Sequence, residues 1–417
     1  LRQALALHRF PAFCAALVGG STLLQIPVQT SLQLLLHAFS SHHLNTRVIR
    51  TVSRFLAALV SASISFRLLN RIPPGSASST INLPMTDLVI CKTGSFDAPP
   101  EDDSLEVDQA TLEAKSLSRA DLAGRTIDLT LFAVMRALDV ALSSVLERTK
   151  AASPSPRLEA AMKGTPITLF CLSAATIMHA WFYSPARLPQ TYNRWISAAA
   201  ELDRRLLLAL RHARYGTWTY GKETGMAPLL GSMCRDYGLP EERGDPAKTI
   251  PIPCELVHMG RGKSCEKHAL VRFWKGWLFA AKMYTPLQCI VSAFLGAFIA
   301  FFYYGVCLSR TRLGPKLFAS KTVTPQMWDS GLCVLGGCLF CGTSILFEHQ
   351  RRRLEILLFV LPRAAATWLP RRYLPEHRWK EHLVFAVSAA TVITAAQESP
   401  RRVRGVLGKV LSEVLTP

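Results

Sequence analysis

The feature that most constrains this chain is a series of apolar stretches without formal charge. The four clearest stretches lack Asp, Glu, Lys and Arg altogether and cover residues 165–184, 283–309, 330–347 and 382–397. A helix of about 20 such residues is long enough to cross the hydrocarbon core of a bilayer, which is about 30 Å thick. The basic residues Lys163 and Arg187 flank the first stretch, as is common at a membrane surface. We therefore expect an all-α, polytopic integral membrane protein.

Four less regular apolar segments bring the expected number of spanning or near-spanning helices to about eight. They cover residues 10–46, 52–69, 129–146 and 354–369. The third of them carries Arg136 and Asp139, which are three residues apart and can therefore neutralise each other on one helix face. The eight segments fall into two groups of four, so we expect two four-helix repeats with amphipathic helices at the membrane interface.

The predicted domain organisation follows from these groups. The first membrane repeat covers residues 1–214 and includes a polar loop at 70–124 and a basic amphipathic helix at 192–214. A polar linker follows at 215–253, and a Cys/His motif with an interfacial helix lies at 254–282. The second membrane repeat covers 283–417 and ends in a basic amphipathic tail.

An internal duplication explains the two groups best. The segment Ser173-Ala-Ala-Thr176 recurs as Ser388-Ala-Ala-Thr391, at a distance of 388 − 173 = 215 residues. At the same distance, Ser184-Pro185-x-Arg187 recurs as Ser399-Pro400-x-Arg402. Two motifs in one register indicate duplication rather than chance. If each copy has four spans, both copies cross the membrane in the same orientation.

Composition and charge indicate the partners. The chain is 49% hydrophobic and 18% charged, with a formal net charge of +19. The arginines lie mostly beside apolar runs and no nucleic-acid-binding motif accompanies them, so we expect contact with anionic lipid headgroups and not with nucleic acid. Other membrane proteins are further possible partners. An odd number of cysteines, 11, favours a reducing compartment over a disulfide framework.

The segment that organises the second half contains two cysteines and two histidines in the pattern Cys254-x3-His258-x6-Cys265-x2-His268. Thiolates and imidazoles at this spacing can surround a tetrahedral Zn²⁺ ion if Gly260 and Gly262 let the loop turn. The spacing is not that of a standard zinc finger. The alternative is that the cysteines are reduced, structural residues of a membrane-proximal loop, so no cofactor is assigned beyond a possible zinc ion.

A basic, aromatic helix is expected directly after this motif, over residues 267–282. Its predicted apolar stripe contains Leu270, Phe273 and Trp277, and its predicted polar face contains Lys267, Arg272, Lys275 and Lys282. Tryptophan and lysine favour the headgroup layer. The predicted membrane-interface residues are Trp274, Lys275, Trp277 and Lys282. We expect this helix to lie along the membrane surface and to turn into the next span near Pro286.

This region resembles a known family. The residues that carry the resemblance are Cys254, His258, Ser264-Cys265, Phe273, Lys275-Gly276, Lys282, Tyr284 and Pro286-Leu287. They resemble the Cys-rich signature of the transmembrane protein 135 family, and the likeness continues over residues 351–363 and to residue 397. The resemblance implies a multi-spanning protein of the peroxisomal or, second, the mitochondrial membrane. It also implies a distant similarity to the import translocases of the mitochondrial inner membrane.

Three functions are considered. The first is a non-enzymatic membrane protein that supports peroxisome or mitochondrion homeostasis, as the resemblance implies. The second is a channel or transporter for a small metabolite, lipid or polypeptide through the helix bundle. The third is a metal-dependent membrane enzyme, for which only Glu255 and Glu266 are placed to act as acid or base near the Cys/His motif.

The pair Cys338-x-x-Cys341 lies within an apolar run and indicates helix packing rather than redox chemistry.

Overall fold

A computed structural model describes residues 10–39, 45–70, 124, 126–152, 156–283, 289–318, 322–371 and 373–415. These residues form helices joined by turns and loops, and no β-strand occurs among them. The expected all-α class is therefore confirmed. The chain divides into two compact units. Of the described residues, unit 1 contains those between 10 and 70, between 124 and 160 and between 369 and 415, and unit 2 contains those between 161 and 368.

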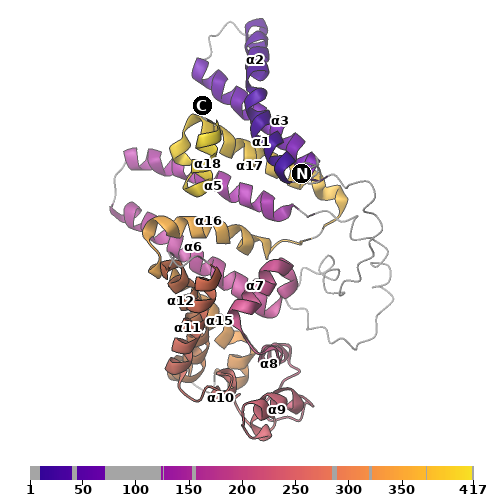
Figure 1. Cartoon of the computed structure of the whole chain (residues 1–417), viewed down its shortest axis with the longest axis vertical. Coiled ribbons are helices and arrows are strands. Elements are labelled where there is room, and N and C mark those ends of the chain that lie inside the picture. The colour runs from indigo at the N-terminus through magenta and orange to yellow at the C-terminus, as the bar shows by residue number, and fades with distance from the viewer. Residues whose placement is uncertain are drawn as a thin grey trace. The chain divides into compact units, whose positions relative to one another are not determined.

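Unit 1 is a bundle of helices from both ends of the chain (Figure 1). Its helices are α1 (Phe10–Leu23), α2 (Gln25–Phe39), α3 (Thr46–Leu69), α5 (Ile127–Ala152), α17 (Arg378–Glu398) and α18 (Gly405–Leu415). Small buried residues, among them Ala57, Ala58 and Ser61, let α3 approach its neighbours closely. The Ser61 hydroxyl donates to the carbonyl oxygen of Ala16 on α1 at 2.5 Å. Helix α17 packs against both α3 and α5.

Unit 2 contains the middle of the chain. Its longer helices are α6 (Pro156–Tyr183, which enters this unit at residue 161), α7 (Gln190–Ala200), α8 (Arg204–Tyr215), α9 (Ala227–Asp236), α11 (Cys265–Met283), α12 (Cys289–Cys307), α15 (Cys333–Cys341) and α16 (Gln350–Ala366). Shorter elements are α10 (Cys254–Val257), α13 (Gly314–Leu317), α14 (Pro325–Met327) and two π-helical turns at Leu308–Leu313 and Trp328–Leu332.

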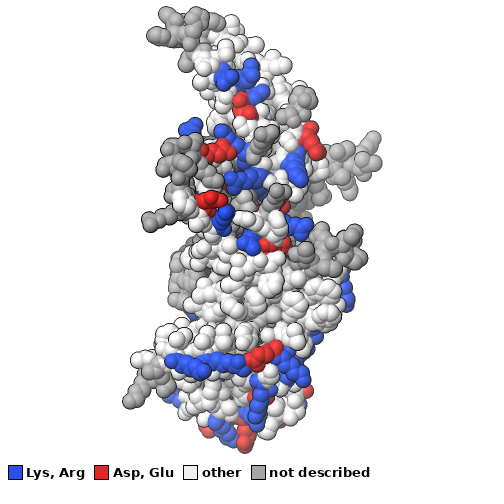
Figure 2. Space-filling view, turned by 90° about the vertical axis from the view of Figure 1, so that its left-hand side faces the viewer, with Lys and Arg blue, Asp and Glu red and all other residues white. Residues whose placement is uncertain are grey.

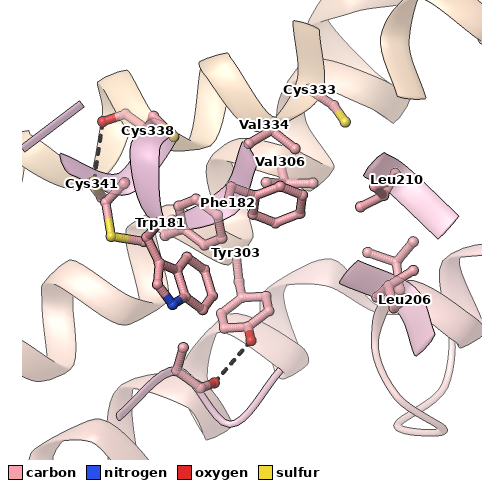
Figure 3. Close-up of a cluster of buried hydrophobic side chains, with 14 of the residues drawn as sticks. Trp181, Phe182, Leu206, Leu210, Tyr303, Val306, Cys333, Val334, Cys338 and Cys341 are labelled. Carbon is pink, nitrogen blue, oxygen red and sulfur yellow. Dashed lines mark hydrogen bonds between the residues drawn. The ribbon is translucent and has the colours of Figure 1, made fainter. Parts of the chain in front are cut away.

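The core of unit 2 is closely packed. Figure 3 shows side chains from several helices in contact, with Trp181 and Phe182 from α6 near Tyr303 and Val306 from α12. Helices α12 and α15 meet through glycine, because a Cβ atom at Gly337 would lie 2.7 Å from Val306 Cγ2. Cys338 and Cys341 are fully buried in this core, which fits the predicted packing role.

The segment predicted as a polar linker, residues 215–253, is an integral part of unit 2. Its side chains Trp218, Leu230 and Met233 are fully buried. Glycine and proline supply the turns of this segment, but its few apolar side chains are enough to attach it to the bundle.

Five helices are long and apolar enough to cross a membrane. They are Thr46–Leu69, Ile127–Thr149, Glu159–Tyr183, Ala293–Leu317 and Pro325–Phe347. The pair Phe10–Leu23 and Gln25–Leu35, bent by 41°, raises the number to six if it counts as one span. Figure 2 shows a broad uncharged area bordered by charged side chains, which fits a surface in contact with lipid tails. These apolar helices indicate a membrane protein with several spanning helices.

This number is lower than the eight expected, because α16 and α17 are not among the helices that qualify within the described residues. Helix α16 is interrupted by Glu355, Pro362 and Arg363. Helix α17 begins with Arg378-Trp-Lys-Glu381 and ends with Gln397-Glu398. Between these polar ends, eight residues are alanine, serine or threonine, whose side chains bring little apolar surface.

The two predicted repeat segments have similar local structure. Ser184 and Ser399 end their helices with φ/ψ of −139°/61° and −150°/75°, and a 3₁₀ turn follows each of them, at Pro185–Arg187 and Pro400–Arg402. Helices α7 and α18, which come next, have 11 residues each. Ser173 and Ser388 have exposed fractions of 4% and 8%. These local matches are what a duplication would leave, while the duplication and the shared orientation of its copies stay predictions.

The compact units divide the chain at other places than the predicted repeats do. Helices α6 and α7 from the first half pack in unit 2, and α17 and α18 from the second half pack in unit 1. Each matched segment therefore lies in the unit that consists mainly of helices from the other half of the sequence.

The glycine contact between α12 and α15 gives a first prediction. Gly337→Ala should lower the free energy of unfolding by about 1–3 kcal/mol, because the added methyl group overlaps Val306 and the backbone of Phe302. Gly164→Ala on α6 is the matched control, since nothing lies within 4 Å of its Cβ position. Thermal unfolding of both variants in detergent measures the difference. Equal melting temperatures would contradict the close α12–α15 contact.

Candidate functional site

The Cys/His motif forms a short helix, a loop and the start of a longer helix. Cys254 begins α10, His258 follows the last residue of α10, and Cys265 begins α11. Gly260 and Gly262 have φ angles of 76° and 81°, in the left-handed region that favours glycine. The predicted turn at these glycines is confirmed, and it brings the start of α11 back to the end of α10.

Three of the four predicted metal ligands converge. The ligand atoms of Cys254, His258 and Cys265 all lie within 4.8 Å of one another. His258 and Cys265 are buried and Cys254 is half-buried. Cys254 and His258 are four residues apart on one helical turn, so their side chains share a face.

His268 lies beside this cluster but does not point at the same centre. Its ring stacks on that of His258, with ring centroids 4.7 Å apart and an angle of 17° between the planes. An imidazole binds a metal ion in the plane of its own ring. Two stacked, nearly parallel rings lie in separate planes, so His258 and His268 do not share one ion. The converging group among the described residues therefore leaves out His268, the predicted fourth ligand.

Cys307, which the sequence analysis did not include in the motif, lies next to His258. The Nε2 atom of His258 lies 3.3 Å from the sulfur of Cys307, the last residue of α12. The Cys265 thiol lies near the thiols of both Cys254 and Cys307. Cys307 lies within an apolar run and far from the motif in sequence, so no spacing pattern includes it.

The protonation state of His258 is set by its surroundings. The Nδ1 atom donates to the carbonyl oxygen of Gly262 at 2.7 Å, which leaves the Nε2 lone pair free to face the Cys307 thiol. Burial lowers the pKa of His258, and burial also lowers the pKa of His268 to about 3. Both rings are therefore neutral at physiological pH, and a neutral imidazole is the form that binds a metal ion.

A buried ion pair lies close to the cysteines. Arg310, in the π-helical turn that follows Cys307, is 2.7 Å from Asp329, and both side chains are almost completely buried. The Tyr220 hydroxyl donates to the Asp329 carboxylate, and Arg310 donates to the carbonyl oxygen of Ile252. The network thus joins residues 215–253 to the ends of two apolar helices, and it satisfies charges that would be costly if left unpaired.

The helix that follows the motif is formed as predicted, but its faces differ from the predicted ones. Arg272, expected on the polar face, has an exposed fraction of 3% and lies over the Tyr303 ring at 4.7 Å. Leu270, expected on the buried stripe, is 69% exposed. The exposed apolar stripe consists of Leu270, Trp274 and Leu278, which are four residues apart and therefore share a face.

The four predicted membrane-interface residues lie on the outside of α11 or near it. Trp274 is 57% exposed and stacks on the half-buried Trp277, with ring centroids 5.1 Å apart. Lys275 forms an ion pair with Glu201 at 2.9 Å, and Lys282 is exposed. Aromatic and basic side chains on one surface remain consistent with the headgroup layer.

The orientation of α11 differs from the expected one. Helix α11 packs along α12, and a Cβ atom at Gly276 would lie 3.2 Å from the Cα atom of Gly296. Contacts of Cys265 with Cys307 and of Arg272 with Tyr303 show that the two helices are antiparallel. A helix in this position accompanies the apolar helix instead of lying across its end. The predicted turn near Pro286 lies outside the described residues.

Unit 2 also contains a cavity of about 600 Å³. Residues of α6, α7, α12 and α16 line it, and most of them are aliphatic or aromatic, for example Phe170, Trp195 and Phe298. Three charged residues, Glu348, Arg352 and Glu355, line one part of it. Glu348 is 2% exposed, and neither of its carboxylate oxygens has a hydrogen-bond partner among the described residues. No sequence motif indicated this cavity.

In comparisons with known proteins, no family model, no curated protein and no solved structure matches this chain. The resemblance to the transmembrane protein 135 family therefore stays a prediction.

The buried ion pair gives a prediction for this region. Asp329→Ala should lower the free energy of unfolding by about 3–5 kcal/mol, because it leaves Arg310 buried without its counter-ion. Glu242→Ala, which removes an exposed pair with Lys248, should cost less than about 1 kcal/mol. Thermal unfolding in detergent compares the two variants. Similar melting temperatures would show that the Arg310–Asp329 pair does not stabilise the site.

Proposed function

We propose that this chain is a non-enzymatic, multi-spanning organelle membrane protein that holds the apolar chain of a lipid-like molecule in unit 2. The cavity among α6, α7, α12 and α16 is the observation that carries the proposal. Ligand cavities in proteins commonly measure about 300–1,000 Å³, and they combine apolar walls with a few polar groups. The cavity in unit 2, at about 600 Å³, has this size and composition.

The walls of the cavity favour a long apolar group. Phe294, Phe298 and Phe302 recur at every fourth position of α12 and face it, and Trp195 and Ile196 contribute from α7. Such surfaces bind hydrocarbon because binding removes apolar surface of both the wall and the ligand from water, or because the ligand takes the place of lipid tails. A small polar metabolite would leave most of this wall without a partner.

The charged residues favour a polar head on the same molecule. Within the part of the chain that the structure describes, the buried carboxylate of Glu348 accepts no hydrogen bond, and burying such a group without a hydrogen bond is costly. A hydroxyl or amine of the occupant would satisfy it. Arg352 and Glu355, both exposed, are next along the cavity wall. An amphipathic molecule with a hydrogen-bond donor in its head therefore fits this site.

The organelle is proposed from the sequence. The resemblance to the transmembrane protein 135 family points to the peroxisomal membrane first and to the mitochondrial membrane second, where such a protein would support homeostasis of the organelle. The nine described free cysteines are compatible with a reducing compartment. The net charge of +19 suits contact with anionic headgroups.

Two alternatives have less support. Transport of a lipid through the bundle would use the same cavity, whereas transport of a polypeptide would need a wider path. A metal-dependent enzyme would need a free acid or base near the cysteines. Glu255 forms ion pairs with Arg243 and Lys263, and Glu266 forms one with Arg312. These pairs favour the non-enzymatic proposal.

Filling the cavity tests the proposed ligand. Full-length protein in detergent is incubated with a long-chain fatty alcohol that carries a photoreactive diazirine, and the labelled peptides are mapped. Ala199→Phe should reduce labelling of α6 and α12 about tenfold, which corresponds to about 1.4 kcal/mol of lost binding free energy. Ala198→Phe is the matched control, because Ala198 is an exposed neighbour on α7 that does not line the cavity. Equal labelling of the two variants would contradict the lipid site.

Localisation is tested separately. A fluorescent tag on the full chain should coincide with a peroxisomal membrane marker, or failing that with a mitochondrial one. Signal confined to the plasma membrane or the endoplasmic reticulum would contradict the proposed organelle. This experiment does not depend on the cavity, so the two parts of the proposal can fail independently.

A further inference from the structure

We propose that Cys254, His258, Cys265 and Cys307 bind one Zn²⁺ ion in a closed tetrahedral site. This inference goes beyond the proposed function and does not depend on the cavity. It assigns the fourth ligand to the end of an apolar helix, and it gives His268 a different role.

The positions of the four side chains are close to those of a zinc site. With Zn–S bonds of about 2.3 Å and Zn–N bonds of about 2.0–2.1 Å, neighbouring ligand atoms of a tetrahedron lie about 3.5–3.8 Å apart. The distance between His258 Nε2 and the Cys307 sulfur is 3.3 Å, and the ligand atoms of Cys254, His258 and Cys265 lie within 4.8 Å of one another. Cys307 lies outside the group whose ligand atoms are all within 4.8 Å of one another, so side-chain movements of about one ångström or more, at Cys307 above all, would complete the tetrahedron.

The chemistry of the donors selects the metal. Three thiolates and one imidazole are soft or borderline ligands, and Cys₃His is one of the usual sets of structural zinc sites. No carboxylate belongs to the converging group, which disfavours Mg²⁺ and Ca²⁺. On binding, the three thiols lose their protons to solvent and form three Zn–S bonds, so affinity should fall as the pH is lowered.

The surroundings of His258 orient it for metal binding. Its Nδ1–H group is held by the Gly262 carbonyl oxygen, as the second nitrogen of a metal-binding histidine usually is. His268 stacks on one face of the His258 ring and itself meets the Tyr303 ring edge-on, with centroids 5.3 Å apart. We assign His268 as a positioning residue that fixes the plane of the His258 ring.

The proposed site has a structural consequence. It fastens the loop between α10 and α11 to the C-terminal end of α12, where the Arg310–Asp329 pair follows within one turn. Four protein ligands leave no open coordination position, so the ion would contribute to folding and not to catalysis.

The first test uses the unaltered chain. Full-length protein is purified in detergent without chelators, after expression in medium supplemented with zinc, and its metal content and zinc X-ray absorption spectrum are measured. About one zinc per chain with three sulfur ligands and one nitrogen ligand is expected. Two sulfur and two nitrogen ligands would overturn the assignment of Cys307. Protein without zinc, or with a disulfide between Cys254 and Cys265 in thiol titration, would overturn the site.

Variants then separate the roles of the residues. Cys307→Ser should weaken zinc binding by at least about tenfold in competition with a chromogenic chelator. Replacing zinc by Co²⁺ should give a sulfur-to-cobalt absorption band, and the loss of one of three thiolates should lower its intensity by about one third. Cys338→Ser is the matched control, because Cys338 is equally buried in unit 2 but outside the cluster. It should leave both readings unchanged.

His268→Phe tests the positioning role. The phenyl ring preserves stacking but has no ligand atom, so the cobalt band should keep its intensity. Loss of the band in His268→Phe together with its retention in Cys307→Ser would reject the proposed ligand set. Should Cys307→Ser fail to fold, the absorption spectrum of the unaltered protein still decides between the two sets. The cavity variant Ala199→Phe should keep its zinc, so failure of the lipid proposal leaves this test intact.

Discussion

Close contact between helices through small residues is the interaction on which both units depend. Lipid tails are as apolar as leucine, so apolar helices in a bilayer gain little from burying large side chains against each other. Glycine, alanine and serine instead let two backbones approach until van der Waals contacts and hydrogen bonds form. Gly276 and Gly296 join α11 to α12, and Gly337 joins α15 to α12. In unit 1, Ser61 both allows the contact of α3 with α1 and forms a hydrogen bond across it.

These contacts also determine where polar groups can lie. Because α11 runs antiparallel to α12, the start of one helix meets the end of the other. Cys265 and Cys307 consequently come together, and Arg310 follows in the next turn, where Asp329 neutralises it. The cysteine cluster and the ion pair therefore lie at one end of the α11–α12 hairpin, and a zinc ion there would hold the same end closed.

The cavity occurs where packing of this kind is absent. Aromatic side chains of α12, among them Phe298 and Phe302, are too large for close backbone contact and leave space between α12, α7 and α16. Helices α7 and α16 are not among the described helices that qualify as spans. An amphipathic occupant could thus contact apolar walls and reach the charged residues of α16 at the same time, which is the property that the proposed function requires.

Local sequence determined much of this protein. The uncharged runs determined the all-α class and the membrane character, because a backbone without water must satisfy its own hydrogen bonds. The spacing of Cys254, His258 and Cys265, with two glycines between the last two, determined that these three would meet, since one helical turn and a short loop leave little freedom. The helix at residues 267–282 was also predicted, although not its faces.

Only the tertiary structure decided which distant residues complete these local pieces. Cys307 joins the cluster because α12 packs antiparallel to α11, and Arg272 is buried because Tyr303 and Glu201 lie opposite it. Likewise, α17 packs in unit 1 although its sequence matches α6 in unit 2. Periodicity records which residues share a face of one helix, but the partner of that face depends on the packing of side chains far apart in the sequence. A single sequence contains no separate signal for that packing.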